Sequence, residues 1–368
     1  MSIDWMGRAV AQAQGLHPYV PGKPIEQLLR EKGLHRAVKL ASNENPYGAS
    51  PKAMVAMQKA IEDMYRYPDG DCTLLKAKLA DKHGVASNRI LLGNGSNEIL
   101  ELLIRTFAGA GDEVIYSQRA FIVYALATQA AGAVQVAVPD DARLGHDLDA
   151  MAKAVTSKTK VICIANPNNP TGTLLLSEQI QPFLDGLPRD VLVILDEAYY
   201  EFVADKVSDS VHALRHPGLV VSRTFSKAYG LAGCRIGYAV AHQNIIAVTN
   251  RFREPFNVNH IAQVAALAAL DDDGWVMDKV EQLKVQRVRL EIAFSDLGVL
   301  GGKSEGNFVL LKHVNALGLL NFFEDKGVIP RPLAGYGMAD YLRISVGKAE
   351  ENDVLLSVLE QGLGEVAS

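Results

Sequence analysis

The sequence V-L-V-I-L-D at residues 191–196 decides the fold. A run of branched aliphatic residues without polar interruption is typical of a strand that is buried on both faces, because a half-exposed strand alternates apolar and polar side chains. Runs of similar length and character, separated by helical stretches, occur at residues 90–93, 113–117, 161–166 and 218–222. Strands that alternate with helices predict an α/β domain with a mostly parallel sheet, right-handed crossovers and flanking helices.

The pattern changes after about Asn259. Long helical stretches at residues 261–270 and 275–294 precede two short strands, G-N-F-V-L-L-K and Y-L-R-I-S-V, and a last helix that starts near Ala349. This order is typical of a smaller α+β domain. We expect the N-terminal arm to join that domain, so that the predicted units are an arm at 1–44, a large domain at 45–262 and a C-terminal small domain at 263–368.

A further helix is predicted to begin at Pro51, with Ser50 as its N-cap, because proline is favoured at the first helical position and serine at the cap. Apolar side chains recur on one face of this helix, namely Met54, Met57, Ile61 and Met64. We expect this stripe to lie in the core.

Composition excludes several classes of protein. The formal net charge of −5 over 368 residues leaves no extended basic surface for nucleic acid or an anionic membrane. The cysteines Cys72, Cys163 and Cys234 are too far apart for a disulfide framework or a C-x-x-C metal motif. No secretion signal or membrane span is recognisable, and we therefore expect a cytoplasmic protein.

Polar motifs begin where the predicted strands end. The strand at 191–196 runs into D-E-A-Y, which places Asp196 and Tyr199 three residues apart. A carboxylate directly after apolar residues is poorly solvated and needs a cationic partner. The preceding strand ends in N-P-N-N-P-T-G, where two prolines bracket Asn168 and Asn169. Because the carboxyl ends of parallel strands carry the sites of such sheets, we expect these side chains to share one site.

A phosphate-binding turn is predicted in G-N-G-S-N-E, residues 93–98. The backbone N–H groups of Gly95, Ser96 and Asn97 are placed at the start of a helix, where they can bind an anion. The segment lacks the third glycine of the dinucleotide motif G-x-G-x-x-G, and alone it fits a plain capped turn equally well.

A candidate covalent catalyst lies in S-R-T-F-S-K-A-Y-G-L-A-G-C-R-I-G-Y, residues 222–238. Lys227 follows the hydroxyl residues Thr224 and Ser226 and precedes Arg235 across a glycine-rich segment. Its amine can condense with an aldehyde while the other groups hold a phosphate. A single lysine in such a loop is more often a solvated side chain, so the interpretation depends on the other motifs.

Together the motifs supply the groups that pyridoxal 5′-phosphate requires. Amides, hydroxyls and Arg235 suit its phosphate, Asp196 its ring cation, Asn169 and Tyr199 its phenolic oxygen, and Lys227 its aldehyde. The nine histidines form no H-E-x-x-H motif, and we expect no metal site.

N-P-N-N-P-T-G, D-E-A-Y, S-K-A-Y-G-L-A-G-C-R-I-G and Y-L-R-I-S-V-G occur here in the order found in the fold-type-I pyridoxal phosphate aminotransferases, which the chain closely resembles. The segments H-P-Y-V-P-G-K-P-I and Y-R-Y-P-D-G favour the subgroup that acts on histidinol phosphate. The resemblance covers nearly the whole chain.

The resemblance implies a role for each cofactor residue. Lys227, Asp196 and Tyr199 would be catalytic, with Lys227 bound covalently to the cofactor and Asp196 paired with its ring nitrogen. Phe121 would stack on the ring, and Asn169 with Tyr199 would hold its oxygen. The phosphate would be bound by Ser96, Asn97, Thr224, Ser226 and Arg235, joined by Tyr67 of the partner subunit in a homodimer. The resemblance also implies a cis peptide bond between Asn169 and Pro170.

For the substrates, the resemblance implies that Arg343 receives the carboxylate of glutamate. Arg331 and Arg343 would receive the phosphate of histidinol phosphate, and Tyr19 would help to close the site. The expected reaction is transamination of L-histidinol phosphate with 2-oxoglutarate, which gives imidazole acetol phosphate and glutamate. The alternatives are an aromatic amino acid aminotransferase and a non-catalytic regulator with the same fold.

Overall fold

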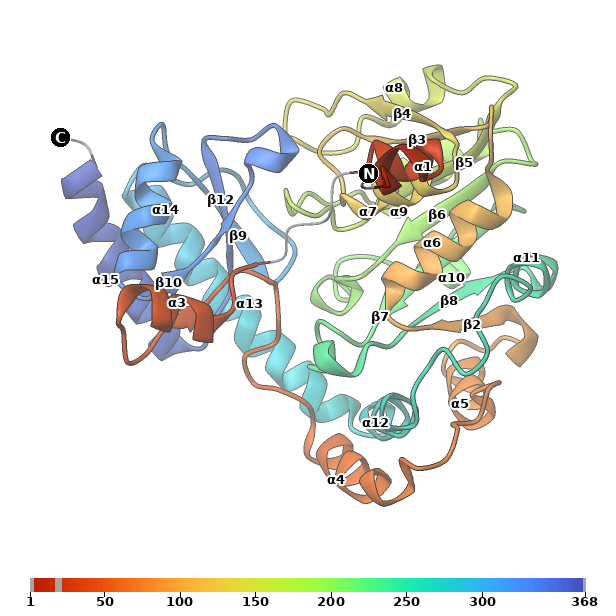
Figure 1. The fold of residues 1–368 in the computed structure, drawn as a ribbon, viewed down its shortest axis with the longest axis horizontal. Coiled ribbons are helices and arrows are strands. Elements are labelled where there is room, and N and C mark those ends of the chain that lie inside the picture. The colour runs from red at the N-terminus through yellow and green to blue at the C-terminus, as the bar shows by residue number, and fades with distance from the viewer. Residues whose placement is uncertain (1–2, 17–21, 367–368) are drawn as a thin grey trace.

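A seven-stranded sheet in the order β2-β8-β7-β6-β5-β3-β4 forms the centre of the large domain in the computed structural model, which describes residues 3–16 and 22–366 (Figure 1). Its strands are β2 (Ile90–Gly93), β3 (Glu113–Ser117), β4 (Val134–Val138), β5 (Thr159–Ala165), β6 (Leu192–Asp196), β7 (Leu219–Thr224) and β8 (Gly237–Ala241). Strand β8 runs antiparallel to both of its neighbours, and the other pairs are parallel. The predicted α/β fold with a mostly parallel sheet is confirmed.

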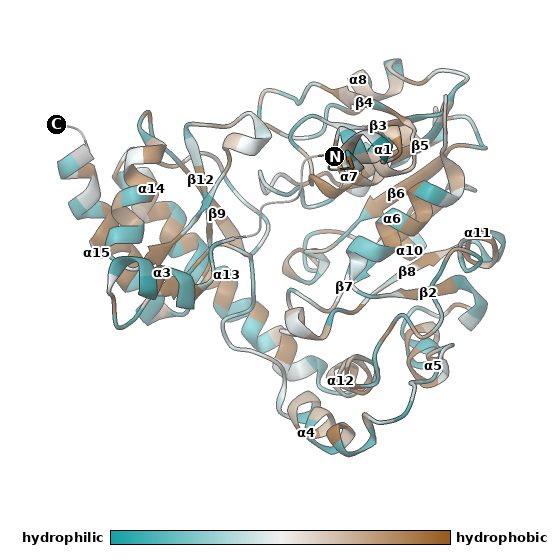
Figure 2. Cartoon of the chain, in the orientation of Figure 1, coloured by the Kyte–Doolittle hydropathy of each residue, from teal (hydrophilic) through white to brown (hydrophobic). Residues whose placement is uncertain are grey.

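Helices cover both faces of this sheet. On one face α6 (Ser96–Phe107) and α7 (Val123–Ala130) pack against alternate strand residues that include Ile194. On the other face α8 (Leu148–Lys153) and α9 (Ser177–Asp185) pack against Val193 and Leu195. The central elements are accordingly rich in hydrophobic residues, as β2, β6 and α6 show in Figure 2. Since strand side chains alternate, Asp196 points to the same face as Ile194, towards α7.

The remaining elements of the large domain complete its outer layer. They are α1 (Trp5–Arg8), α2 (Ala11–Gln14), α4 (Pro51–Ala60), η1 (Ile61–Asp63), α5 (Thr73–Lys82), η2 (Ser87–Arg89), η3 (Tyr200–Phe202), α10 (Ser210–Ala213), η4 (Ala232–Cys234), α11 (Gln243–Thr249) and α12 (His260–Leu270).

The small domain is built on a three-stranded antiparallel sheet in the order β11-β12-β9. Its elements are α3 (Ile25–Lys32), β1 (Val38–Lys39), α13 (Asp273–Asp296), β9 (Phe308–Lys312), α14 (Ala316–Asp325), β10 (Val328–Ile329), β11 (Arg331–Pro332), η5 (Ala334–Tyr336), β12 (Tyr341–Ser345) and α15 (Ala349–Val366). The N-terminal segment joins it, because β1 pairs with β10 and the Leu40 carbonyl accepts a hydrogen bond from the amide of Ser345.

The boundary expected between residues 262 and 263 falls inside α12, which packs against α4 of the large domain. Helix α13 then runs from the large domain into the small one (Figure 1). Packing therefore favours a boundary between α12 and α13, and the domain limits stay a prediction. Within the described part of the chain, no helix has both the length and the apolar composition needed to cross a membrane.

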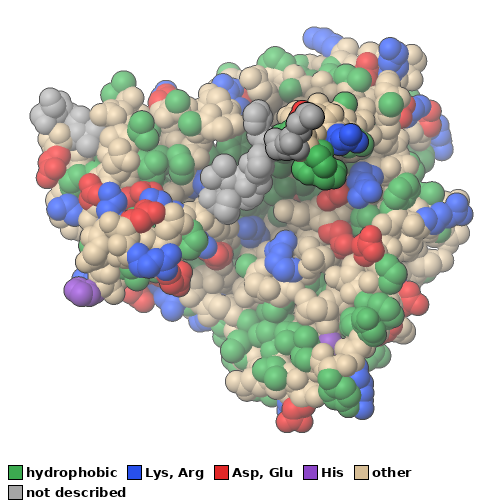
Figure 3. All heavy atoms as spheres, in the orientation of Figure 1, with side chains coloured by type: hydrophobic (Ala, Val, Ile, Leu, Met, Phe, Trp, Pro, Cys, Tyr) green, Lys and Arg blue, Asp and Glu red, His purple; other side chains and the backbone are tan. Residues whose placement is uncertain are grey.

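The N-terminus of α4 is confirmed, since Pro51 is its first residue and the Ser50 hydroxyl accepts a hydrogen bond from the amide of Ala53. The expectation that its apolar stripe lies in the core holds for Met57, which is partly buried against the core, and is wrong for the other three residues. Met54, Ile61 and Met64 are 45%, 62% and 46% exposed. The helix instead buries its alanines, whose small side chains allow close packing on α12. An apolar surface over α4 results, and hydrophobic side chains gather there in Figure 3.

Candidate active site

A cavity of about 190 Å³ opens at the carboxyl ends of β5, β6 and β7, between the two domains. The molecular surface is hollowed in this region (Figure 3). The predicted residues that line it are Ser96, Asn97, Phe121, Asn169, Tyr199, Thr224, Ser226, Lys227, Arg235, Arg331 and Arg343. The chain thus brings together side chains from seven separate stretches of sequence.

Lys227 lies in the loop that follows β7 and is partly buried. Its Nζ donates a hydrogen bond of 3.0 Å to the carbonyl of Ser42. Burial lowers the pKa of Lys227 to about 7, and the charge of Arg343 acts in the same direction. Because a neutral amine is the nucleophilic form, this lysine is ready to attack a carbonyl near neutral pH.

Asp196 ends β6 and is 4% exposed. Its Oδ2 accepts a hydrogen bond of 2.9 Å from the hydroxyl of Tyr124, which lies on α7. Its Oδ1 is buried and has no hydrogen-bond partner among the described residues. Burial raises the pKa of Asp196 to about 6, although the Tyr124 hydroxyl opposes the shift. A buried carboxylate oxygen without a donor fits a ligand that brings a cationic N–H to it.

The phosphate-binding end of the pocket is formed where α6 begins. Arg235 has a φ of 60° and donates a 3.3 Å hydrogen bond to the Ser226 hydroxyl. Glycine is required around it: a Cβ on Gly95 would clash with the Arg235 guanidinium, and a Cβ on Gly237 would lie 2.6 Å from the amide nitrogen of Ser96. Amide N–H groups, hydroxyls and a guanidinium therefore converge on a space that glycines keep open, which suits a dianion.

The loop N-P-N-N-P-T-G contains two cis bonds, Asn166–Pro167 and Asn169–Pro170. The second was predicted, so that prediction is confirmed; the first was not foreseen. The side chain of Asn166 exchanges hydrogen bonds with the backbone of Leu175, donating to its carbonyl at 2.9 Å and accepting from its amide at 2.8 Å. These contacts hold the loop against the end of β5.

The small domain closes the other side of the pocket. Arg331 and Arg343 are directly opposite each other on β11 and β12. Arg343 is 7% exposed and donates one hydrogen bond to the carbonyl of Ala41 and another to Oδ1 of Asn169. This guanidinium thereby joins the small domain, the N-terminal segment and the large-domain loop at one point. The position of Arg331 beside it concentrates positive charge at the mouth of the pocket.

Sequence reasoning missed three residues of the site. Tyr124 follows Phe121 by three residues, so the two share one face at the start of α7, but no motif marks it. Asn43 lies in the string A-S-N-E-N-P-Y-G, and its Nδ2 donates a 2.8 Å hydrogen bond to the hydroxyl of Tyr199. Tyr336 lines the pocket from η5.

Two predicted residues are not brought into this pocket. Tyr67 is 82% exposed, stacks on Phe256 with ring centroids 4.8 Å apart, and lines a separate cavity of about 340 Å³. Tyr19 lies outside the described residues. In the part of the chain that the structure describes, no group of three or more His, Cys, Asp or Glu side chains could hold a metal ion.

A lysine in a cleft whose charge acts on a buried carboxylate, on a sheet of this strand order, is typical of the transferases of fold type I. The family model described as "Aminotransferase class I and II" matches residues 36–359. The chain therefore belongs to this family.

Relatives with established names are similar to almost the whole chain. Histidinol-phosphate aminotransferase 1 of Idiomarina loihiensis is 49% identical, with 94% of this chain and 95% of that protein covered. Histidinol-phosphate aminotransferase 2 of Pseudomonas aeruginosa is 46% identical, with coverages of 99% and 98%. The crystal structure of histidinol-phosphate aminotransferase from Sinorhizobium meliloti in complex with pyridoxal-5′-phosphate is 28% identical and superposes with a TM-score of 0.91, covering 99% of this chain and 100% of that one.

The lowered pKa of Lys227 predicts selective modification of the apoprotein. Reductive methylation of Lys227 by formaldehyde should rise with pH through about 7, whereas ordinary lysines respond near 10. Mass spectrometry of digested peptides measures this. In Arg343→Met the rise should move to higher pH, because a neighbouring positive charge is lost. A midpoint for Lys227 near 10 in the unmodified sequence would contradict the environment described.

The contact between Tyr124 and Asp196 predicts a pH-dependent stability change. Tyr124→Phe leaves the ionised carboxylate without its donor, so it should lower the free energy of unfolding by about 1–2 kcal/mol at pH 8. The loss should be smaller at pH 5, where Asp196, with a raised pKa of about 6, is mostly neutral. Urea denaturation at both pH values measures it. The matched control is Tyr116→Phe, which removes a hydroxyl bonded to Gln135 instead; an equal pH dependence in both variants would refute the assignment.

Proposed function

We propose that the protein is a pyridoxal phosphate-dependent aminotransferase that converts L-histidinol phosphate and 2-oxoglutarate into imidazole acetol phosphate and glutamate. The observation that carries the proposal is that one pocket holds Lys227 together with hydroxyls and a guanidinium suited to a phosphate, while the charge of Lys227 acts on the buried carboxylate of Asp196. The substrate assignment is supported by relatives that share 46–49% of their residues with almost the full chain.

The residues present fit the cofactor. Oδ1 of Asp196 lacks a donor and would accept the ring N–H, and the half-neutral amine of Lys227 would form the covalent link. The groups proposed to hold the phosphate are Ser96, Asn97, Thr224, Ser226 and Arg235, with Asn169 and Tyr199 at the ring oxygen and Phe121 on the ring face. When bound, the cofactor supplies an aldehyde and an aromatic ring that accepts electrons.

The chain's own residues then perform the proton chemistry. The Nζ of Lys227, with a pKa lowered to about 7, would take the proton from the substrate Cα and later return a proton, as general base and acid. Asp196 remains an anion that keeps the ring nitrogen protonated, and its burial makes this pairing strong because water does not compete. The Asn43 hydrogen bond fixes the Tyr199 hydroxyl in direction.

One pocket serves both substrates. The guanidinium of Arg343 binds a carboxylate or a phosphate in two-point fashion, so it suits glutamate as well as histidinol phosphate. Arg331, opposite it on the neighbouring strand, supplies the second positive charge that a dianionic phosphate requires. Tyr19 is proposed to cover the bound substrate.

A homodimer is part of the proposal. Tyr67 is exposed beside the apolar surface formed by Met54, Ile61 and Met64, which a second copy would cover. Tyr67 would then reach the phosphate in the pocket of the partner subunit. We place the enzyme in the cytoplasm, in histidine biosynthesis, without nucleic-acid or membrane partners.

The substrate assignment predicts a gain from the phosphate group. Steady-state kcat/KM with histidinol phosphate should exceed that with unphosphorylated histidinol by at least about tenfold, since hydrogen bonds to charged groups contribute about 1.5–3 kcal/mol each. Purified protein titrated with histidinol phosphate should also lose the visible absorbance of its resting form. Lys227→Ala, as the control, should show neither turnover nor that absorbance. A higher kcat/KM for phenylalanine would support the aromatic amino acid aminotransferase instead.

A shared site predicts complementation between subunits. Tyr67→Phe should weaken cofactor retention, and Lys227→Ala should be inactive. A mixed dimer of the two variants contains one site with both intact residues, so at limiting cofactor its activity should exceed the sum of the parents. Size-exclusion chromatography with light scattering checks the assembly. A monomer in solution, or mixed samples without gain, would contradict the shared site.

A further inference from the structure

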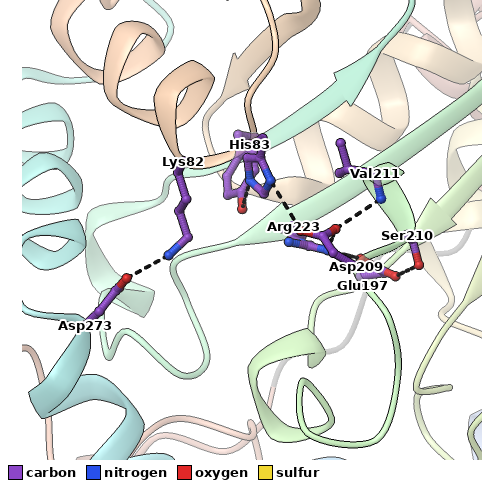
Figure 4. A network of polar contacts seen from close by, with 9 residues as sticks. Lys82, His83, Glu197, Asp209, Ser210, Val211, Arg223 and Asp273 are labelled. Carbon is purple, nitrogen blue, oxygen red and sulfur yellow. Dashed lines mark hydrogen bonds and ion pairs between the residues drawn. The ribbon is translucent and has the colours of Figure 1, made fainter. Parts of the chain in front are cut away.

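A charged cluster lies in the protein interior behind the pocket (Figure 4). Arg223 on β7 and Glu197, directly after β6, are each 2% exposed. The Nε and Nη2 atoms of Arg223 lie 2.9 and 2.8 Å from Oε2 of Glu197. Nη2 also donates to Oδ1 of Asp209 at 2.7 Å. The Arg223 guanidinium therefore pairs with two carboxylates at once.

Three further residues contact the Glu197–Arg223 pair or its partner Asp209. The hydroxyl of Ser210 donates to Oε1 of Glu197 at 2.5 Å, and the Arg223 guanidinium lies 3.5 Å from the ring centre of Tyr200. His83 of α5 contacts the cluster, with its Nδ1 3.6 Å from Oδ2 of Asp209. Such a number of partners fixes the geometry, because moving any one group would leave a buried polar atom unsatisfied.

Strand geometry connects this cluster to the active site. Asp196 pairs in register with Ser222, and the amide of Glu197 donates to the Ser222 carbonyl at 2.8 Å. Because successive side chains point to opposite faces of a sheet, the Glu197 side chain lies on the face opposite to that of Asp196, and the Arg223 side chain lies on the face opposite to that of Thr224. The ion pair thus joins the ends of β6 and β7 at the two residues next to those of the pocket.

We propose that Glu197 and Arg223 act as a positioning pair for the reaction. They fix the distance between the strand end that carries Asp196 and the strand end that leads to Lys227, and Arg223 compensates the negative charge that Glu197 places beside Asp196. The inference rests on the proposed function, since it concerns the pairing of Asp196 with a ring cation. Neither residue lines the pocket, so both act through their neighbours.

Charge supports this arrangement. Burial raises the pKa of Asp196, and the negative charge of Glu197 adds to the rise while Tyr124 and Lys227 oppose it. Burial acts to lower the pKa of Arg223, but the neighbouring acidic groups, of which Glu197 has the largest effect, together outweigh burial, and the pKa is raised. Without Arg223, Glu197 would act on Asp196 as an uncompensated buried anion, which favours a protonated Asp196.

The groups around both carboxylates belong to several elements. Those that face Asp196 are Tyr124 on α7, Cys163 on β5, Tyr199 and Lys227, and those that face the ion pair are His83, Tyr200, Glu201, Asp209 and Tyr238. None of these groups is itself substituted in the Arg223 and Glu197 variants, and the double variant removes both charges of the pair at once. A change in the ionisation of Asp196 is then assigned to the pair.

The test compares two ligands of the apoprotein. Arg223→Met should weaken the binding of pyridoxal phosphate at pH 5 by about tenfold, because below the pKa of Asp196 a rise of one unit in that pKa lowers the ionised fraction of the carboxylate about tenfold. The affinity for an analogue with carbon in place of the ring nitrogen should fall much less, because this analogue places no cation beside Asp196. The double variant Glu197→Gln/Arg223→Met removes both charges. In it, the ratio of the dissociation constants of the two ligands should return most of the way to its value in the unmodified protein. Arg287→Met is the matched control, since it removes another buried arginine, paired with Glu305.

Outcomes separate the two claims. Two results overturn the positioning pair. One is a folded Arg223→Met variant in which the affinity for pyridoxal phosphate, relative to that for the analogue, is unchanged. The other is an equal fall of this relative affinity in Arg287→Met. If Arg223→Met does not fold, Glu197→Gln decides: removing the like charge should shift the pH midpoint of pyridoxal phosphate binding to lower pH, and no shift overturns the inference. A protein that binds both ligands as expected but does not transaminate histidinol phosphate refutes the proposed function alone.

Discussion

The buried carboxylate of Asp196 is the constraint on which the rest of the structure depends. An anion that is 4% exposed at the end of an apolar strand is costly unless its charge and both of its oxygens are compensated. Tyr124 serves one oxygen from α7, and the positive charges of the pocket lie on the other side. The second oxygen of Asp196 therefore requires a cationic donor, and a bound cofactor with a protonated ring nitrogen provides one.

A second constraint is the junction at Arg343. Its guanidinium binds the carbonyl of Ala41 and the amide oxygen of Asn169, so a strand of the small domain is tied to the segment after β1 and to the loop after β5. The same side chain is proposed to bind substrate anions. Substrate binding and domain contact thus compete for one set of N–H groups, and the anion that arrives takes over bonds that already hold the two domains together.

Much of this could be predicted from sequence, because each cofactor motif is short and follows an apolar strand. The seven predicted strands are present, and most of the predicted site residues between Ser96 and Arg343 line one pocket. Two strands of the central sheet were missed: β4, because its exposed, alternating residues resemble a surface segment, and β8, because it begins inside the glycine-rich segment that was interpreted as a loop. The stripe on α4 was misassigned because periodicity identifies an apolar face but not what covers it. Tyr124 escaped notice because its role depends on α7 packing over β6, a contact between distant parts of the chain.

Helix α13 has a mechanical consequence. It consists of 24 residues and so is about 36 Å long, and it begins beside α12 and packs on β9 in the small domain. Strand β9 pairs with β12, which carries Arg343. A tilt of about 5° at the base of a rod of this length moves its far end by about 3 Å, the length of a hydrogen bond. A displacement of that size would be enough to break the hydrogen bond that Arg343 donates to Asn169 of the large domain.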